Sequence, residues 1–218
     1  MTNLYFECNF GISGDMAIGA LLDLGANRKK LDKALQLMNL EKEFDYVISK
    51  KQINSIEAVD FDVIINTKHN HTHRNLDDIN RIIDKTDMTE NARLIAKKIF
   101  NVIAQIEAKV HNKPLDKIHF HEVGAIDSIV DIVSFSVLID DLNPEKVYFS
   151  TLYDGHGSVE CQHGLIPVPV PAVCEIVSRY QLPIAITDTK GEMITPTGAA
   201  IAAVVSSGEK LPKNGFYN

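Results

Sequence analysis

The sequence has little of what secreted, membrane and nucleic-acid-binding proteins need. It has three cysteines in 218 residues, and this odd number at wide spacing suits a reducing cytoplasm better than a disulfide framework. No apolar run approaches the roughly 20 residues that span a bilayer, and the first residues lack the basic start and apolar core of a signal peptide. The net charge is −7, without a stripe rich in Lys and Arg, so we expect neither nucleic acid nor a membrane as a partner.

The apolar content is sufficient for a folded core. Hydrophobic residues make up 45% of the chain and charged residues 23%, which is ordinary for a globular protein. The length allows one large domain or two small ones. We treat residues 1–218 as a single region, with a candidate internal boundary near residues 67–74.

Segments with strand and helix patterns alternate, which predicts an α/β fold with a mixed sheet flanked by helices. The expected strands cover residues 4–6, 44–53, 56–65, 147–149, 155–161 and 184–186, and the second and third form a hairpin. One helix is expected to begin after Ser13, and others cover residues 31–40, 76–83, 89–111, 125–142, 172–180 and 199–205. Prolines at alternate positions from 167 to 171 exclude a central strand there.

The densest chemistry lies at His119, His121 and Glu122, followed by Asp127 and Asp131. In an extended segment the two histidines point to the same side, and in a helix the two aspartates share a face. Nitrogen and oxygen ligands of this kind suit a divalent transition metal such as Zn, Ni, Fe or Mn. A polar strand face followed by a solvated or capping Asp pair is the alternative.

A second group of candidate ligands alternates at His69, His71 and His73, within a polar stretch that is typical of an exposed loop. Such a loop either captures metal loosely, because nothing orients its imidazoles, or is merely polar.

A third group contains Cys161 and His163 among glycines. These two residues form either a soft chelating pair suited to Ni, Cu or Zn or part of a glycine-rich hairpin.

Two short loops place backbone N–H groups at an expected helix N-terminus, which is a common anion site. One contains Gly11, Ser13 and Gly14, with Ser13 as candidate N-cap. The other begins at Thr195, also a candidate N-cap, and has Pro196 at the first helical position. Neither loop has a known nucleotide-binding signature, and simple helix capping is the more ordinary explanation.

The first loop is followed directly by a carboxylate. Asp15 lies in the first turn of the expected helix and opposes a bare phosphate there, but it suits a metal or a metal-bound phosphate.

Together these segments resemble the nickel-insertion family of the LarC type. The resemblance rests on residues 11–16, 73–76, 119–131, 163–169 and 195–200, of which the thirteen-residue run from His119 is the most specific. The chain departs from the family in having Glu7 where Asp is common and in its short histidine tract. Family members are also about twice as long, with a ferredoxin-like C-terminal half that is linked to nucleotide binding.

The resemblance implies a chelatase of the lyase class that inserts Ni(II) into pyridinium-3,5-bisthiocarboxylic acid mononucleotide. The product is the nickel-pincer cofactor of lactate racemase-type enzymes, in which one carbon and two sulfurs hold the nickel. The full-length reaction is associated with CTP, with Mg or Mn. The implied partners are the mononucleotide, the C-terminal half of the family protein, a lactate racemase-type apoenzyme and a second copy of the chain.

Three sets of site residues follow from the residue patterns and the resemblance. The candidate bases that remove the ring proton are His121, Glu122 and Asp127. The candidate residues for the substrate's phosphate are Gly11, Ser13, Gly14, Thr195, Thr197 and Gly198. The candidate metal ligands are Asp15, His69, His71, His73, His119, His121, Asp127, Asp131, Cys161 and His163.

Two other functions remain open at this stage. One is a nickel storage or delivery module without chemistry of its own. The other is a metal-dependent hydrolase that activates water at His119, His121, Asp127 and Asp131.

Overall fold

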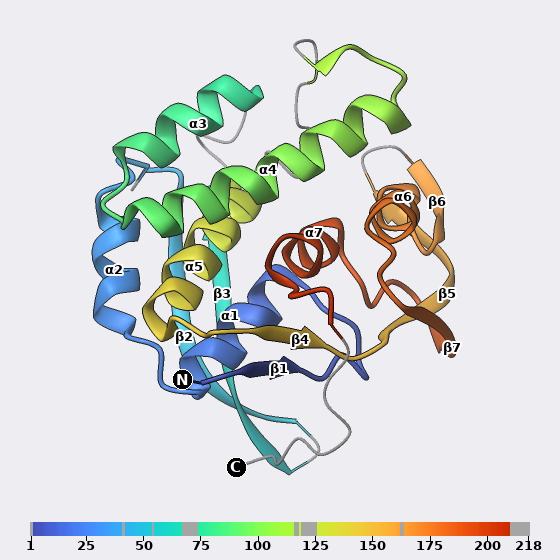
Figure 1. Cartoon of the computed structure of the whole chain (residues 1–218), viewed down its shortest axis with the longest axis horizontal. Coiled ribbons are helices and arrows are strands. Elements are labelled where there is room, and N and C mark those ends of the chain that lie inside the picture. The colour runs from blue at the N-terminus through green and yellow to red at the C-terminus, as the bar shows by residue number, and fades with distance from the viewer. Residues whose placement is uncertain are drawn as a thin grey trace.

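The computed structural model describes residues 2–40, 42–53, 55–66, 74–115, 118, 126–161 and 164–209. Within these ranges the structure confirms the α/β class (Figure 1). The helices are α1 (Gly14–Asp23), α2 (Arg28–Gln36), α3 (Leu76–Lys85), α4 (Glu90–Val110), α5 (Ile126–Leu142), α6 (Pro171–Tyr180) and α7 (Pro196–Val205). The strands are β1 (Leu4–Phe6), β2 (Phe44–Ile53), β3 (Ile56–Ile65), β4 (Val147–Phe149), β5 (Leu152–Cys161), β6 (Gly164–Val168) and β7 (Ile184–Lys190).

In the described ranges the strands form three small sheets rather than one mixed sheet. Strand β1 pairs with β4 in parallel, and β2 and β3 form the expected antiparallel hairpin. The third sheet has the order β6-β5-β7, in which β5 is antiparallel to β6 and parallel to β7. Strand β6 carries Pro167 and lies at an edge of its sheet, as the missing proline N–H requires.

Helix α5 is buried because its apolar residues occupy almost every side of it. It packs against α1, α2, α4 and β3. Helix α4 is longer and amphipathic, and it also contacts α3, α6 and α7. Figure 1 shows α4 crossing one side of the molecule from α3 to α6. Its C-terminal end therefore lies above the part of the fold that contains α6, α7 and the β5 sheet.

The three cysteines differ in exposure: Cys8 is buried, Cys161 is half-buried and Cys174 is exposed. None of the described helices is both long enough and apolar enough to cross a bilayer.

Candidate functional site

The two predicted loops meet side by side, although about 180 residues of chain separate them. Ile12 and Ile194 form a parallel β-bridge between the loops. The Ile12 N–H donates to the Met193 carbonyl at 3.0 Å, and the Thr195 N–H donates to the Ile12 carbonyl at 3.1 Å. These bonds hold the start of α1 beside the start of α7.

Two glycines allow this close approach. A Cβ on Gly198 would lie 2.5 Å from the carbonyl carbon of Ile12 and 3.0 Å from the amide nitrogen of Ser13. Gly11 has a φ of +81°, and a Cβ there would lie 2.7 Å from the Cβ of Met193. A side chain at either position would separate the two loops, because contacts this short are sterically excluded.

Both helices begin with the predicted cap. Ser13 Oγ accepts a hydrogen bond from the Met16 N–H at 3.4 Å and itself donates to the Asp15 carboxylate. Thr195 Oγ1 accepts from the Gly198 N–H at 3.1 Å. Each cap satisfies one of the free N–H groups in the first turn, so others remain for a ligand.

Asp154 holds the loop before α7 in place through hydrogen bonds from the backbone. This side chain is completely buried, and its Oδ1 accepts from the N–H groups of Gly155 at 2.8 Å, Met193 at 2.8 Å and Ile194 at 3.2 Å. Its Oδ2 is also buried and has no hydrogen-bond partner among the described residues. Asp154 thus ties strand β5 to the loop that carries Thr195.

The predicted Asp pair lies on one face of α5. Asp127 is in the first turn, where its Oδ1 accepts from the Ser128 N–H at 2.8 Å. Asp131 follows one turn later and packs against Gly14, where a Cβ would lie 2.8 Å from the Cβ of Asp131. The absence of a side chain at Gly14 therefore makes room for this carboxyl group.

Burial and neighbouring carboxylates change the acidity of this pair. Burial, with smaller contributions from Asp15 and Asp127, raises the pKa of Asp131 to about 8. Burial also raises the pKa of Asp127, against hydrogen bonds from backbone N–H groups. A positive ion beside these groups would relieve both effects, because it favours the charged carboxylate.

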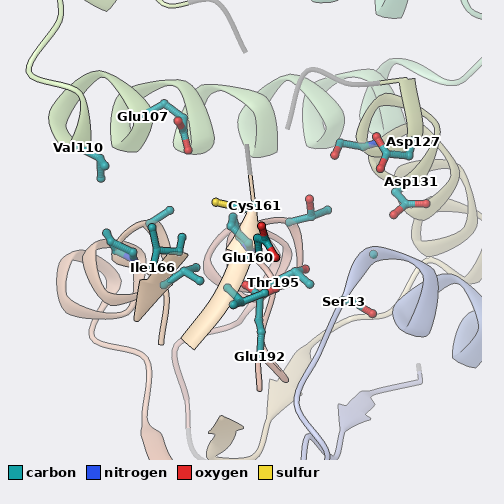
Figure 2. Close-up of a pocket in the computed structure, with 18 of the residues that line it drawn as sticks. Ser13, Glu107, Val110, Asp127, Asp131, Glu160, Cys161, Ile166, Glu192 and Thr195 are labelled. Atoms are coloured by element: carbon teal, nitrogen blue, oxygen red, sulfur yellow. The ribbon is translucent and has the colours of Figure 1, made fainter. Parts of the chain in front are cut away.

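These segments enclose one cavity of about 500 Å³ (Figure 2), a volume typical of small-molecule sites. The N-terminal ends of α1, α5, α6 and α7 line it, together with the last turn of α4, the end of β5 and Ile166 of β6. Val170 is the N-cap of α6, and no side chain accepts a capping hydrogen bond there. Several helix N-termini therefore open into the same space, and each favours negative charge.

The last turn of α4 and the end of β5 add polar groups between the walls. Nε2 of His111 lies 3.2 Å from Oε2 of Glu107, one helical turn away. Figure 2 shows Glu107 on α4 above Cys161 and Glu160 of β5. The lining of the cavity therefore includes a carboxylate, an imidazole and a thiol group in this region.

The charge of the lining favours cations. Its carboxylates belong to Asp15, Glu107, Asp127, Asp131, Glu160 and Glu192, and no Lys or Arg lines the cavity in the described part of the chain. In the described lining an anionic group would find backbone N–H groups at the helix N-termini and the hydroxyl groups of Ser128, Thr195 and Thr197. Among the described residues no three His, Cys, Asp or Glu side chains lie close enough together to hold a metal ion.

The structure brings together several of the residues that the sequence predicts as site residues. Those that line the cavity are Ser13, Gly14, Asp15, Asp127, Asp131, Cys161, Thr195 and Thr197. Gly11 and Gly198 lie in the contact between the loops instead of in the cavity wall. The other predicted residues, His69, His71, His73, His119, His121, Glu122 and His163, lie outside the described residues.

Several lining residues were missed by the sequence analysis. Glu107 and His111 had a detectable signal, because they form an i,i+4 polar pair at the end of an otherwise apolar helix face. Val159, Ile166 and Val170 had none, since a half-buried aliphatic residue in a strand or at a helix start is ordinary core material.

Comparison with known proteins gives a family match over nearly the whole chain. A family model described as nickel insertion protein matches residues 4–215. A pyridinium-3,5-bisthiocarboxylic acid mononucleotide nickel insertion protein of Alkaliphilus metalliredigens is 48% identical over 225 residues, covering 96% of this chain and 53% of that protein. A protein of the same name from Acetivibrio thermocellus is 47% identical, covering 95% of this chain and 52% of its own length.

Other relatives carry related names. A putative nickel insertion protein of Dictyoglomus thermophilum is 44% identical and is covered over 52% of its length. The chain thus spans about half the length of these relatives. No solved structure gives a significant match.

Proposed function

Because the chain belongs to the nickel insertion protein family, we propose that its cavity brings Ni(II) together with pyridinium-3,5-bisthiocarboxylic acid mononucleotide. The observation that carries this proposal is the meeting of three features in one cavity. These are the Asp127 and Asp131 carboxylates of α5, the N-termini of α1 and α7, and the thiol-bearing end of β5. The first can bind a cation and the second a phosphate.

The reaction requires ligands that release nickel. Inserting Ni(II) breaks one ring C–H bond, forms one Ni–C and two Ni–S bonds, and transfers the ring proton to a base. The carboxylates of Asp15, Asp127 and Asp131 suit temporary binding better than a closed set of thiolates. The proposed nitrogen ligands His119 and His121 shortly precede Asp127 and Asp131 in the sequence.

Asp127 is a candidate base for the ring proton because it lines the cavity and its pKa is raised by burial. His121 and Glu122 are the other candidates. Cys161, in the middle of the cavity, is positioned to contact the metal between its entry and its insertion. The proposed capture of nickel by His69, His71 and His73 precedes these steps, and His163 is the proposed chelating partner of Cys161.

The phosphate of the mononucleotide is proposed to bind at the paired helix N-termini. Ser13, Gly14, Thr195 and Thr197 line the cavity there, and Gly11 and Gly198 act by allowing the loops to approach. A triphosphate usually needs Lys or Arg as well, and none lines the described part of the cavity. We therefore assign CTP, with Mg or Mn, to the part of the longer relatives that this chain does not match.

The same argument indicates the partners of the chain. The remaining half of a full-length family protein is the proposed partner for the CTP-dependent step, and a lactate racemase-type apoenzyme is the proposed recipient of the product. A homo-oligomer of the chain also remains a proposal.

Single-turnover assembly tests the proposed function. The chain is mixed with Ni(II), the mononucleotide substrate, CTP and magnesium, and the nickel–carbon product is measured by mass spectrometry, with the full-length relative assayed in a parallel reaction. We expect nickel binding but little product from the chain alone. Assembly at the full-length rate would place all the chemistry in this half.

The other outcomes separate the remaining functions. Nickel binding that never leads to product, even as part of the full-length protein, supports a delivery module. Hydrolysis of the substrate without nickel incorporation supports a metal-dependent hydrolase. Failure to bind nickel would contradict both the chelatase and the delivery function.

A further inference from the structure

One side of the cavity is apolar. Val110 of α4, Val159 of β5, Ile166 of β6 and Val170 at the start of α6 line this side, which we call the apolar wall. Figure 2 shows Val110 and Ile166 at the opposite side of the cavity from Asp127. The cavity therefore has two chemically different sides, one aliphatic and one acidic.

The apolar wall is held by regular backbone structure. Val159 and Ile166 are direct partners across the antiparallel β5–β6 pair, so their side chains lie on the same face of the sheet. The neighbouring Leu165 points to the other face and is 73% exposed. Val170 is 5% exposed and is fixed as the N-cap of α6.

The surroundings of the wall select among apolar ligands. An aliphatic surface of this kind packs well against the face of a flat ring. Glu107 lines the cavity beside the wall, and its negative charge favours a ring that carries positive charge over a neutral one. A phosphate linked to that ring through a sugar would reach toward Thr195, which lies in the middle of the cavity.

We propose that the apolar wall is the subsite for the pyridinium ring of the mononucleotide and that Ile166 determines the preference for this ring. This assignment rests on the proposed function and adds the residues that orient the substrate. Figure 2 shows Glu107 and Cys161 between the apolar wall and the carboxylates of α5, so a ring on the wall would have these two groups between it and Asp127. The metal and the ring carbon therefore approach one another in the middle of the cavity.

Calorimetry with two probes tests the subsite on the 218-residue chain. Nicotinic acid mononucleotide carries a pyridinium ring and a phosphate, whereas ribose 5-phosphate lacks the ring. We expect Ile166→Ala to weaken binding of nicotinic acid mononucleotide about tenfold, because its side chain loses apolar contact with the ring. Binding of ribose 5-phosphate should not change.

Two further variants control for folding. Leu165→Ala removes an aliphatic side chain from the other face of the same strand, and it should leave both affinities unchanged. Val110→Thr changes a residue that is 42% exposed, so it should keep the fold while still weakening binding of the pyridinium probe. Thermal unfolding of each variant measures any loss of stability separately.

Three results would overturn the subsite. These are equal effects of Ile166→Ala and Leu165→Ala, equal weakening of both probes by Ile166→Ala, and failure of wild type to bind nicotinic acid mononucleotide. A nickel titration of the same samples keeps the proposed function separate. Ring binding that depends on Ile166, without nickel binding, would support the subsite and contradict nickel insertion. Nickel binding without ring binding would contradict the subsite and leave nickel insertion supported.

Discussion

At the scale of single residues, Asp131 is the carboxyl group of the cavity whose ionised form is strongly disfavoured. Its carboxyl group is buried against Gly14, and Asp15 and Asp127 are close enough to oppose its ionisation. The resulting pKa of about 8 means that the metal-free protein binds a proton here at neutral pH. A divalent cation would replace that proton, so this position couples metal binding to proton release.

We predict that Asp131→Asn stabilises the metal-free chain at alkaline pH. Since folding raises the pKa of Asp131, its favourable contribution is complete below the unfolded pKa of about 3.9 and is lost as pH rises through about 8. Asparagine resembles the protonated form at every pH. Thermal unfolding with a chelator at pH 9 should therefore show an increase of several degrees, since about 1 kcal/mol corresponds to roughly 2–4 °C in a chain of this size.

The effect should disappear near pH 4, where wild type is protonated in both states. Asp141→Asn is the matched control, because this carboxylate on the same helix pairs with Lys30 at 2.7 Å and gains from being charged. Its substitution should lower stability slightly or not at all. A fall in the unfolding temperature of Asp131→Asn at pH 9 would show that the carboxylate is stabilised in the folded chain.

Asp154 gives a second prediction for a single residue. Replacing it with Ala leaves three backbone N–H groups without their acceptor, so we expect a loss of about 3 kcal/mol or more in the free energy of unfolding. Asp154→Asn keeps an acceptor oxygen and should cost less. Denaturant unfolding measures the stability of both variants, and Asp188→Ala, which changes an exposed residue of β7, is the control. Equal stability of Asp154→Ala and wild type would refute the role of the Asp154 carboxylate.

At the scale of elements, α1 and α7 act as a pair. Their loops share a β-bridge, and the glycines between them leave no room for a side chain. The two N-termini therefore have a fixed relative position, which neither helix would have alone. A phosphate bound between them would experience both helix dipoles together.

We predict that Gly198→Ala weakens both folding and phosphate binding. The added methyl group would meet the Ile12 carbonyl, which should cost about 1–3 kcal/mol of stability and move the N-terminus of α7 away from that of α1. Calorimetry with ribose 5-phosphate should show weaker binding. The control Ala203→Gly, later in the same helix, should cost about 1 kcal/mol of stability and leave the affinity unchanged; equal affinities in both variants would contradict the paired site.

The sequence predicted the local features of α1, α5 and α7 better than the contact between the loops before α1 and α7. Ser13 and Thr195 were identifiable as N-caps because capping depends on the residues that follow directly. The shared face of Asp127 and Asp131 followed from helical spacing alone. The pairing of Ile12 with Ile194 has no local signal, because it depends on long-range packing around α4 and α5.

Local sequence patterns also could not predict how many sheets the strands form. Strand β6 was not expected, and although the other described strands were expected close to where they lie, alternation along the chain does not determine which strands pair. The apolar wall was missed for a related reason, since only the folded chain shows that Ile166 faces a cavity while other aliphatic residues face the core.

At the scale of the whole molecule, the family model matches residues 4–215, and the chain spans about half the length of its relatives. Figure 1 shows α4 crossing from the α5 side of the fold toward α6, and the last turn of α4 lines the cavity together with residues of α5, α6 and β5. Groups for a cation, a phosphate and a flat ring therefore come from segments that extend from residue 13 to residue 197.

The central claim is that this cavity binds nickel through the carboxylates of α5. The most direct test is calorimetric titration of Ni(II) into the wild-type chain, Asp131→Asn and the control Asp77→Asn, which changes an exposed first-turn residue of α3. We predict that wild type and the control bind equally at pH 7.5, that binding weakens below about pH 6 as imidazoles become protonated, and that Asp131→Asn binds at least about tenfold more weakly. No binding by wild type at pH 7.5, or equal binding by Asp131→Asn, would contradict the claim.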